Sequence, residues 1–135
     1  METLTAIETE LGILQGRDCV YLNTLIQDDF GHLTLSGDIN GHLIYNNTNK
    51  KDWISYQLVF QQVLAYFSCE LDTYEMFENN ADYQSSFVMV NASRWIEKLP
   101  IRKDIDCSLY KHYRFYTYDV VYDILAVDFQ MTIDD

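Results

Sequence analysis

The residue types that could do chemistry begin with a carboxylate-rich turn in the first third of the chain. Asp28 and Asp29 stand side by side, Gly31 follows, and Asp38 lies a few positions further on. Several carboxylate oxygens together are what a hard cation such as Ca²⁺ prefers. The spacing is not that of a calcium-binding loop, however, and Asp close to Gly is the usual composition of a tight turn. We therefore predict a turn here and no metal site.

The three histidines are the next candidates. His32 and His42 flank the segment that contains Asp38, which raises the question of a transition-metal site. Such a metal needs three or four ligands at close spacing, and the chain has neither a His-Glu-x-x-His motif nor a Cys/His cluster. His112 is expected to be an interstrand polar residue and not a general base, because no Ser or Cys nucleophile stands in a recognisable setting with it. A partner that folding alone brings close to His112 stays open.

The cysteine and glycine patterns indicate no chemistry either. Cys19, Cys69 and Cys107 are odd in number and far apart, and no Cys-x-x-Cys pair occurs. They are expected to be reduced and buried as small apolar side chains. Gly37 and Gly41 match neither the dinucleotide fingerprint nor the P-loop. The sequence thus predicts no catalytic residue, no metal and no cofactor.

An acidic segment interleaved with aromatic residues is the main candidate for function. Carboxylates steer a basic molecule toward a surface, and neighbouring rings supply contact area at a low cost in side-chain entropy. The alternative is a solvated loop whose rings pack onto the domain. The candidate partner-binding residues are five carboxylates, Glu70, Asp72, Glu75, Glu78 and Asp82, and two aromatic anchors, Tyr74 and Phe77.

The whole chain is strongly acidic. Of its 135 residues, 21 are acidic and nine are basic, which gives a formal net charge of −12. Direct binding to nucleic acid or to an anionic membrane needs Lys and Arg, so neither is an expected partner. A basic protein would be attracted, although solubility explains the acidity equally well.

Length and composition predict one domain that spans 1–135. Pro occurs once and Gly five times, so no linker stands out. The first residues lack the basic and apolar regions of a signal peptide, and no apolar run is long enough to span a membrane. A cytoplasmic protein is therefore expected.

An N-terminal helix is the first structural element that the pattern predicts. Thr5 and Glu8 fit a capping box, and apolar residues follow at spacings of four and three, namely Ile7, Leu11 and Leu14. A helix this short must pack its apolar stripe on something larger.

The larger partner is expected to be a mostly antiparallel sheet of about six strands. Segments 19–26, 32–39, 85–90 and 112–133 have the composition or the alternation of strands, and apolar residues keep one parity from Val121 to Ile133. Segment 53–71 fits a strand whose apolar parity switches at Gln61–Gln62, and it fits a helical stripe nearly as well; its aromatic and β-branched content favours the strand. Ser93 is expected to cap a short helical turn near 93–99. The predicted fold class is α+β.

A resemblance to known proteins rests on three stretches of the chain. These are residues 53–60 (WISYQLVF), 70–75 (ELDTYE) and 111–119 (KHYRFYTYD), and they resemble small uncharacterised bacterial proteins. Some proteins of that size and acidity are immunity partners of secreted or contact-delivered toxins. The resemblance implies a binding role and assigns no role to any single residue.

These observations together predict a non-enzymatic acidic binding protein, with an immunity-type inhibitor of a basic partner protein as its specific form. One alternative is a small enzyme or ligand-binding domain whose pocket is lined by Tyr and His, with His112 and Asp119 as its polar groups. The other is a structural homo-oligomer that pairs strand edges or aromatic faces.

Overall fold

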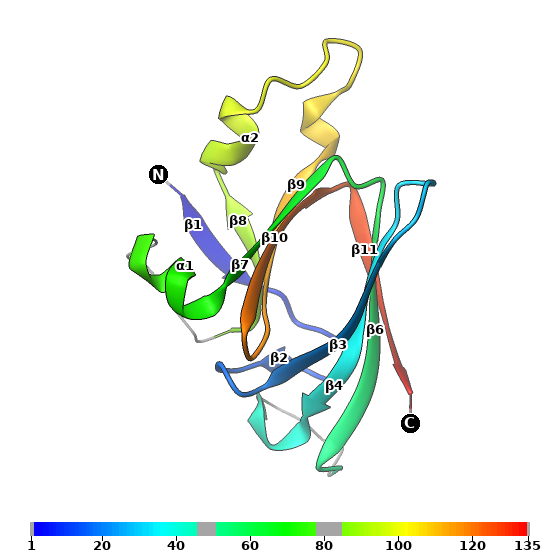
Figure 1. The fold of residues 1–135 in the computed structure, drawn as a ribbon, viewed down its shortest axis with the longest axis vertical. Coiled ribbons are helices and arrows are strands. Elements are labelled where there is room, and N and C mark those ends of the chain that lie inside the picture. Colours follow the sequence, from blue (N-terminus) through cyan, green and yellow to red (C-terminus); the bar gives the residue numbers. More distant parts are fainter. Residues whose placement is uncertain (1, 46–50, 78–84, 135) are drawn as a thin grey trace.

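The computed structural model describes residues 2–45, 51–77 and 85–134, which form a mostly β protein (Figure 1). Its strands are β1 (Thr3–Ala6), β2 (Ile13–Leu14), β3 (Val20–Gln27), β4 (Leu33–Asn40), β5 (Ile44–Tyr45), β6 (Trp53–Gln61), β7 (Ala65–Glu70), β8 (Phe87–Asn91), β9 (Lys111–Tyr116), β10 (Val120–Ala126) and β11 (Asp128–Asp134). Its helices are α1 (Leu71–Phe77) and α2 (Arg94–Lys98), with the 3-10 turns η1 (Gly41–Leu43) and η2 (Cys107–Leu109). The α+β prediction is therefore wrong.

Two antiparallel sheets enclose the main core. The five-stranded sheet has the order β1-β8-β9-β10-β7, the four-stranded sheet has the order β11-β6-β4-β3, and β2 pairs separately with β5. Apolar side chains from both large sheets meet between them. The largest fully buried members of this core include Leu33, Leu35, Ile39, Ile54, Leu58, Phe60, Phe87, Tyr113 and Phe115.

A long two-stranded ribbon runs through both sheets and joins them. β10 pairs with β7 in the five-stranded sheet, and β11 pairs with β6 in the four-stranded sheet, so the same two chain segments stay partnered around the corner (Figure 1). Between β6 and β7, Gln62 has a φ of 52°, a left-handed conformation that bends the strand. The predicted strand in 53–71 with a switch at Gln61–Gln62 is confirmed, and the helical alternative is wrong.

The alternating apolar residues from Val121 to Ile133 are divided between the two sheets at the same corner. Val121 packs on the outer face of the five-stranded sheet, whereas Phe129, Met131 and Ile133 pack on the core between the sheets. The chain changes sheet at Val127, which is the residue between β10 and β11. Apolar residues that share one parity in the sequence therefore pack on two different faces, the outer face of one sheet and the core between the sheets.

The predicted N-terminal helix is wrong, because residues 3–6 form a strand. β1 pairs with β8 from Thr3 opposite Asn91 to Ala6 opposite Val88. The Asn91 side-chain amide donates to the hydroxyls of Thr3 and Thr5 at 3.2 and 2.7 Å, so Thr5 supports a strand pair instead of capping a helix. A helix this short gains little stability from its own hydrogen bonds, whereas β8 offers the backbone of β1 a row of partners.

The β3–β4 hairpin matches its prediction. Asp28 Oδ1 accepts hydrogen bonds from the amides of Phe30 and His32, each at 2.9 Å, and Gly31 has a φ of 85°. The predicted turn is confirmed, with its Asp and its Gly in the expected roles. Along β4, buried and half-exposed residues alternate as the sequence pattern requires.

Two short helices cover the outer face of the five-stranded sheet. Ser93 Oγ accepts from the amide of Ile96 at 3.2 Å and caps α2, which confirms the predicted helical turn. α1 contributes Leu71 and Tyr74 to a second apolar cluster on this face. Neither helix in the described part of the chain has the length and apolarity that a membrane span requires.

Gly37 permits a close approach between β3 and β4. It lies on the inward side of β4 opposite Leu22, beside a bulge in β3. A Cβ atom on Gly37 would overlap the carbonyl oxygen of Tyr21. That oxygen also accepts a hydrogen bond from the buried hydroxyl of Tyr56 at 3.1 Å. A side chain at this position would therefore disturb both a strand pair and a core hydrogen bond.

Replacing Gly37 with Ala is expected to lower the free energy of unfolding by about 1–3 kcal/mol, the usual cost of overpacking a buried position. The Ser36→Ala variant, one residue earlier on the outward side, is the matched control and is expected to stay within about 0.5 kcal/mol of wild type. Urea unfolding monitored by circular dichroism measures both. Equal unfolding midpoints for the two variants would show that β3 does not crowd Gly37.

Candidate binding surface

The acidic segment begins with Glu70, which the structure assigns to helix capping. Its carboxylate accepts hydrogen bonds from the amides of Asp72 and Thr73 at 2.9 and 3.1 Å and from the Thr73 hydroxyl at 2.7 Å. The Thr73 hydroxyl bond and then the Asp72 amide bond lower the pKa of Glu70, so the side chain is charged at neutral pH. Glu70 thus fixes the start of α1, from which the exposed carboxylate of Asp72 projects.

The predicted aromatic anchor Tyr74 is a buried residue. Its side chain is 2% exposed, and its ring lies under the Arg114 guanidinium at 5.3 Å and beside the Tyr116 ring at 6.5 Å. Tyr74 therefore holds α1 on the sheet and presents no ring to a partner. The predicted contacts of the Phe77 side chain, Glu78 and Asp82 lie outside the described residues.

Arg17 connects α1 to a set of aromatic residues. One guanidinium nitrogen lies 3.0 Å from Asp72 Oδ1 and the other lies 4.0 Å from Glu75 Oε1. The same guanidinium lies over the Tyr118 ring, 6.0 Å from its centre. Asp72, Glu75 and Tyr118 are thus neighbours in space although Tyr118 comes from the distant β9–β10 turn.

Three aromatic residues continue this surface across the end of the four-stranded sheet. Tyr118 stacks on Tyr21 with ring centres 5.2 Å apart, and Tyr21 meets the Trp53 ring edge-on at 5.4 Å. Trp53 is 54% exposed and Tyr118 is 42% exposed, so both rings offer area to another molecule. The row extends from β6 through β3 to the β9–β10 turn and reaches α1 through Arg17.

Further carboxylates surround the aromatic row. Burial raises the pKa of Tyr21, and the negative charges of Asp18 and Asp119 raise it further, so both carboxylates lie within electrostatic reach of the ring. Asp38 is the cross-strand neighbour of Tyr21 and accepts hydrogen bonds from Asn23 and Ser55 at 3.2 and 3.1 Å. We call the set made of Tyr21, Trp53, Tyr118, Asp18, Asp38, Asp72, Glu75, Asp119 and Arg17 the acidic–aromatic surface.

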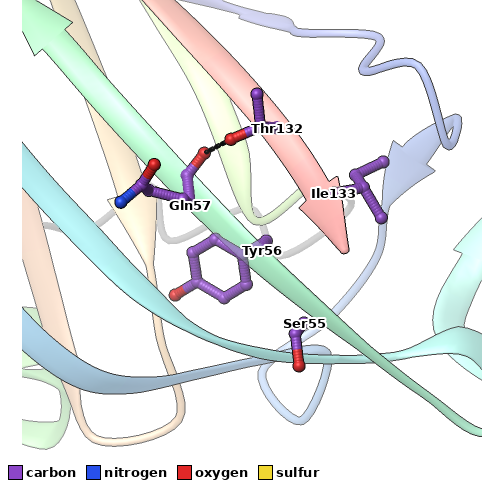
Figure 2. A pocket seen from close by; sticks show the side chains of 5 residues that line it. All are labelled: Ser55, Tyr56, Gln57, Thr132 and Ile133. Carbon is purple, nitrogen blue, oxygen red and sulfur yellow. Dashed lines mark hydrogen bonds between the residues drawn. The ribbon is translucent and has the colours of Figure 1, made fainter. Parts of the chain in front are cut away.

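A shallow pocket adjoins this surface along β6. It has a volume of about 340 Å³ and is lined by Ser55, Tyr56, Gln57, Thr132 and Ile133 (Figure 2). The Thr132 hydroxyl donates to the Gln57 carbonyl at 3.5 Å across β11 and β6. Ser55, whose hydroxyl binds Asp38, belongs to both the pocket lining and the edge of the acidic–aromatic surface. The pocket thus lies next to Trp53 on the same strand, and both polar and apolar side chains line it.

A buried polar network lies elsewhere, on the outer face of the five-stranded sheet. His112 Nε2 lies 2.6 Å from Asp123 Oδ1, and Arg114 Nε donates to the same oxygen at 2.8 Å. Ser93 Oγ lies 2.7 Å from His112 Nδ1. The side chains of His112, Arg114 and Asp123 are each less than a tenth exposed. His112 is thus an interstrand polar residue, as the sequence predicted, with partners that only the fold brings together.

The roles within this network are positional. Ser93 Oγ accepts from the Ile96 amide while it contacts His112, so the hydroxyl is engaged on both sides as the cap of α2. Trp95 of α2 also packs edge-on against the His112 ring at 5.4 Å. The network therefore fastens α2 to the sheet. Asp119, expected beside His112 in the alternative hypothesis, instead lies in the β9–β10 turn near Tyr21.

Each of the other two histidines contacts a carboxylate with one ring nitrogen. His32 Nδ1 lies 2.9 Å from Asp28, and His42 Nε2 lies 2.7 Å from Asp52. Within residues 2–45, 51–77 and 85–134, no group of three or more His, Cys, Asp or Glu side chains could hold a metal ion.

Sequence reasoning located the carboxylates of the acidic–aromatic surface near α1 but missed its rings. Tyr21, Trp53 and Tyr118 come from three separate segments, and only the strand order places them side by side. The available signal was weak: Trp53 stands on the outward parity of β6, where a polar residue is usual.

Comparison of the chain with protein-family models, with curated proteins and with solved structures finds no match in any of the three.

Proposed function

We propose that the protein is a non-enzymatic binding protein that holds a basic partner protein against its acidic–aromatic surface. The observation that carries the proposal is the unbroken series of contacts from Trp53 through Tyr21, Tyr118 and Arg17 to Asp72. Exposed rings beside carboxylates are the combination that binds Lys and Arg side chains, because the ring faces and the carboxylates both attract cations.

The balance of charge on this surface favours a basic partner. Five carboxylates, those of Asp18, Asp38, Asp72, Glu75 and Asp119, stand against the single guanidinium of Arg17. The net charge of −12 adds a long-range attraction that speeds encounter with a positive molecule. The exposed Trp and Tyr rings then supply the contact area on which affinity depends.

In its specific form the proposal is an immunity-type inhibitor that covers the basic surface of a toxin in the cytoplasm. An acidic surface that presents carboxylates and rings suits a partner whose own site is positively charged, as nuclease sites are. The three free cysteines fit a reducing compartment.

The experiment is affinity capture from a lysate of the native cells at about 50 mM salt, near which surface charges are weakly screened. Wild-type protein is expected to retain a basic protein that elutes at about 300 mM salt. The Asp72→Asn/Asp119→Asn double variant is expected to bind the purified partner about ten- to a hundredfold more weakly, as is Trp53→Ala, because each removes part of the contact surface. Isothermal titration calorimetry with that partner gives the affinities.

The matched control is the Asp29→Asn/Asp128→Asn variant. It loses the same two negative charges, but its residues lie in the β3–β4 turn and at the start of β11, away from the acidic–aromatic surface. It is expected to bind almost as tightly as wild type. Equal weakening of both double variants would mean that only the overall charge matters, and the absence of any basic protein at low salt would remove the proposal.

A further inference from the structure

β11 lies at one edge of the four-stranded sheet (Figure 1). Among the strands and helices of the described residues, only β6 runs alongside it, and its seven residues pair with β6 in unbroken register. In an antiparallel pair, alternate residues turn their N–H and C=O groups away from the neighbouring strand. The Phe129 amide donates to the carboxylate of Asp128 at 2.8 Å, a side-chain acceptor within the same strand. β11 thus offers a row of backbone donors and acceptors to another extended chain.

The other sheet edges in the described part of the chain are less suited to an added strand. β1 has only four residues. β3 is interrupted by a bulge between Leu22 and Thr24, and its Val20 carbonyl already accepts from the Tyr118 amide at 2.8 Å. β7 ends at Glu70, whose carboxylate caps α1. β11 is therefore the longest of these edges that has no bulge.

The inward row of β11 is only partly covered. Phe129, Met131 and Ile133 are half-buried and pack against the main core, whereas their cross-strand neighbours on β6 are each at most 3% exposed. The difference arises because β6 lies between β4 and β11, whereas β11 has β6 on one side alone. Apolar side chains on an added strand would cover this row and remove its remaining area from water. The structure therefore favours a strand with apolar residues at alternate positions.

The charge of β11 decides which kind of strand fits. The strand begins at Asp128 and ends at Asp134, and neither β11 nor β6 contains Lys or Arg. A second copy paired antiparallel about Met131 would set Asp128 opposite Asp134 at both ends, and like charges directly opposite each other destabilise a strand pair. The net charge of −12 on each copy adds to this repulsion. A strand with Lys or Arg at both ends is attracted instead.

We propose that β11 binds an extended segment of a basic protein, which adds a strand to the four-stranded sheet. The segment carries Lys or Arg at both ends and apolar residues at alternate positions between them. Its backbone supplies the affinity, and its alternate side chains supply the specificity, as in other cases of strand addition. The site is separate from the acidic–aromatic surface, so it does not depend on the function proposed for that surface.

The probe is the peptide Lys-Val-Thr-Val-Thr-Val-Lys with blocked termini and a fluorescent label. Its binding is followed by fluorescence anisotropy at about 50 mM salt. The peptide Glu-Val-Thr-Val-Thr-Val-Glu is expected to bind at least about tenfold more weakly, because its end charges are repelled. Lys-Val-Thr-Pro-Thr-Val-Lys is expected to lose at least about tenfold as well, because Pro has no backbone N–H to donate. The Lys-ended probe is expected to slow amide hydrogen exchange along β11 and not along β3.

Charge reversal in the protein tests which residues face the ends of the peptide. The Asp128→Lys/Asp134→Lys variant is expected to bind the Glu-ended peptide about tenfold more tightly than the Lys-ended one, which reverses the wild-type preference. The matched control, Asp29→Lys/Asp52→Lys, makes the same charge change at two exposed residues outside β11. It is expected to keep the wild-type preference. Equal effects of the two variants would mean that only the overall charge matters and would overturn the proposal.

Two other outcomes place the peptide or the edge differently. If Asp72→Asn/Asp119→Asn loses the Lys-ended peptide and Asp128→Lys/Asp134→Lys keeps it, the peptide lies on the acidic–aromatic surface, which overturns strand addition and supports the function proposed above. If exchange along β11 slows with rising protein concentration in the absence of peptide, a second copy occupies the edge and the proposal is wrong. Equal affinity for the Pro-containing and Pro-free peptides would show that no strand is added.

Discussion

The Asp123→Asn variant is expected to unfold with a free energy about 3–5 kcal/mol lower than that of wild type, because it breaks a buried ion pair from one side only. Asp123 Oδ1 accepts from both Arg114 and His112 inside the sheet. The amide of Asn cannot balance the charge of Arg114, which stays buried beside it. Urea unfolding at pH 7, followed by tryptophan fluorescence, gives the difference.

The matched control for Asp123 is Asp104. Asp104 makes two hydrogen bonds with Arg102 on the surface, and both side chains are more than half exposed. Water and salt screen that pair, so Asp104→Asn is expected to cost less than about 1 kcal/mol. Similar losses for the two variants would mean that the buried network contributes no more than a surface ion pair.

The same network gives stability a defined dependence on pH. Burial on its own raises the pKa of Asp123, but the hydrogen bond from His112 and the charge of Arg114 outweigh burial, so the pKa is lowered. A lowered folded-state pKa adds stability that is fully present above the unfolded-state pKa of about 3.9 and is lost as pH falls through the folded-state value. The difference in stability between wild type and Asp123→Asn is therefore expected to be constant above about pH 5 and to shrink in more acidic solution.

The Phe87→Ala variant is expected to lose about 3–5 kcal/mol of unfolding free energy through the cavity that it leaves. The Phe87 ring is fully buried, and its centre lies 5.0 Å from that of Phe129 and 5.4 Å from that of Phe115. Phe129 and Phe115 belong to different sheets, so the Ala variant leaves its cavity between the two layers.

Phe87→Leu is the control because it keeps an apolar side chain of more similar volume. Its loss of stability is expected to be clearly smaller than that of Phe87→Ala. Guanidinium unfolding curves with equal slopes for all three proteins would show that the comparison concerns the native core. A loss below about 1 kcal/mol for the Ala variant would place the centre of the core elsewhere.

The parts of the fold that could be predicted from the sequence are those with a local signal. Alternation along 32–39 and the Asp–Gly turn before it fix one hairpin, because a period of two and a turn composition act within a few residues. The N-terminal segment could not be predicted in this way. Thr5 matches the sequence pattern of a helix cap. Pairing with β8, which is distant in sequence, favours the strand conformation over the helix for this segment.

In the candidate site, too, only the features with a local sequence signal could be predicted. Asp72 and Glu75 belong to an acidic segment interleaved with apolar and aromatic residues, so the negative charge of the segment is evident from the sequence alone. Whether a neighbouring ring faces solvent depends on what covers it, and strand pairing across the sheet sets the position of Arg114, whose guanidinium lies over the Tyr74 ring. The Trp53 ring, which is exposed to solvent, stands well before that segment in the chain.

The ribbon that turns the corner between the sheets has a consequence for how the molecule opens. Each sheet takes one edge strand and one interior strand from the same pair of segments, so neither layer keeps its full set of partners if the other is lost. We therefore expect that neither sheet unfolds independently of the other and that the two sheets unfold in a single cooperative transition. During synthesis, β7 must wait for β10 and β6 must wait for its second partner β11, because both partners follow later in the chain, so each strand keeps an unpaired edge until then.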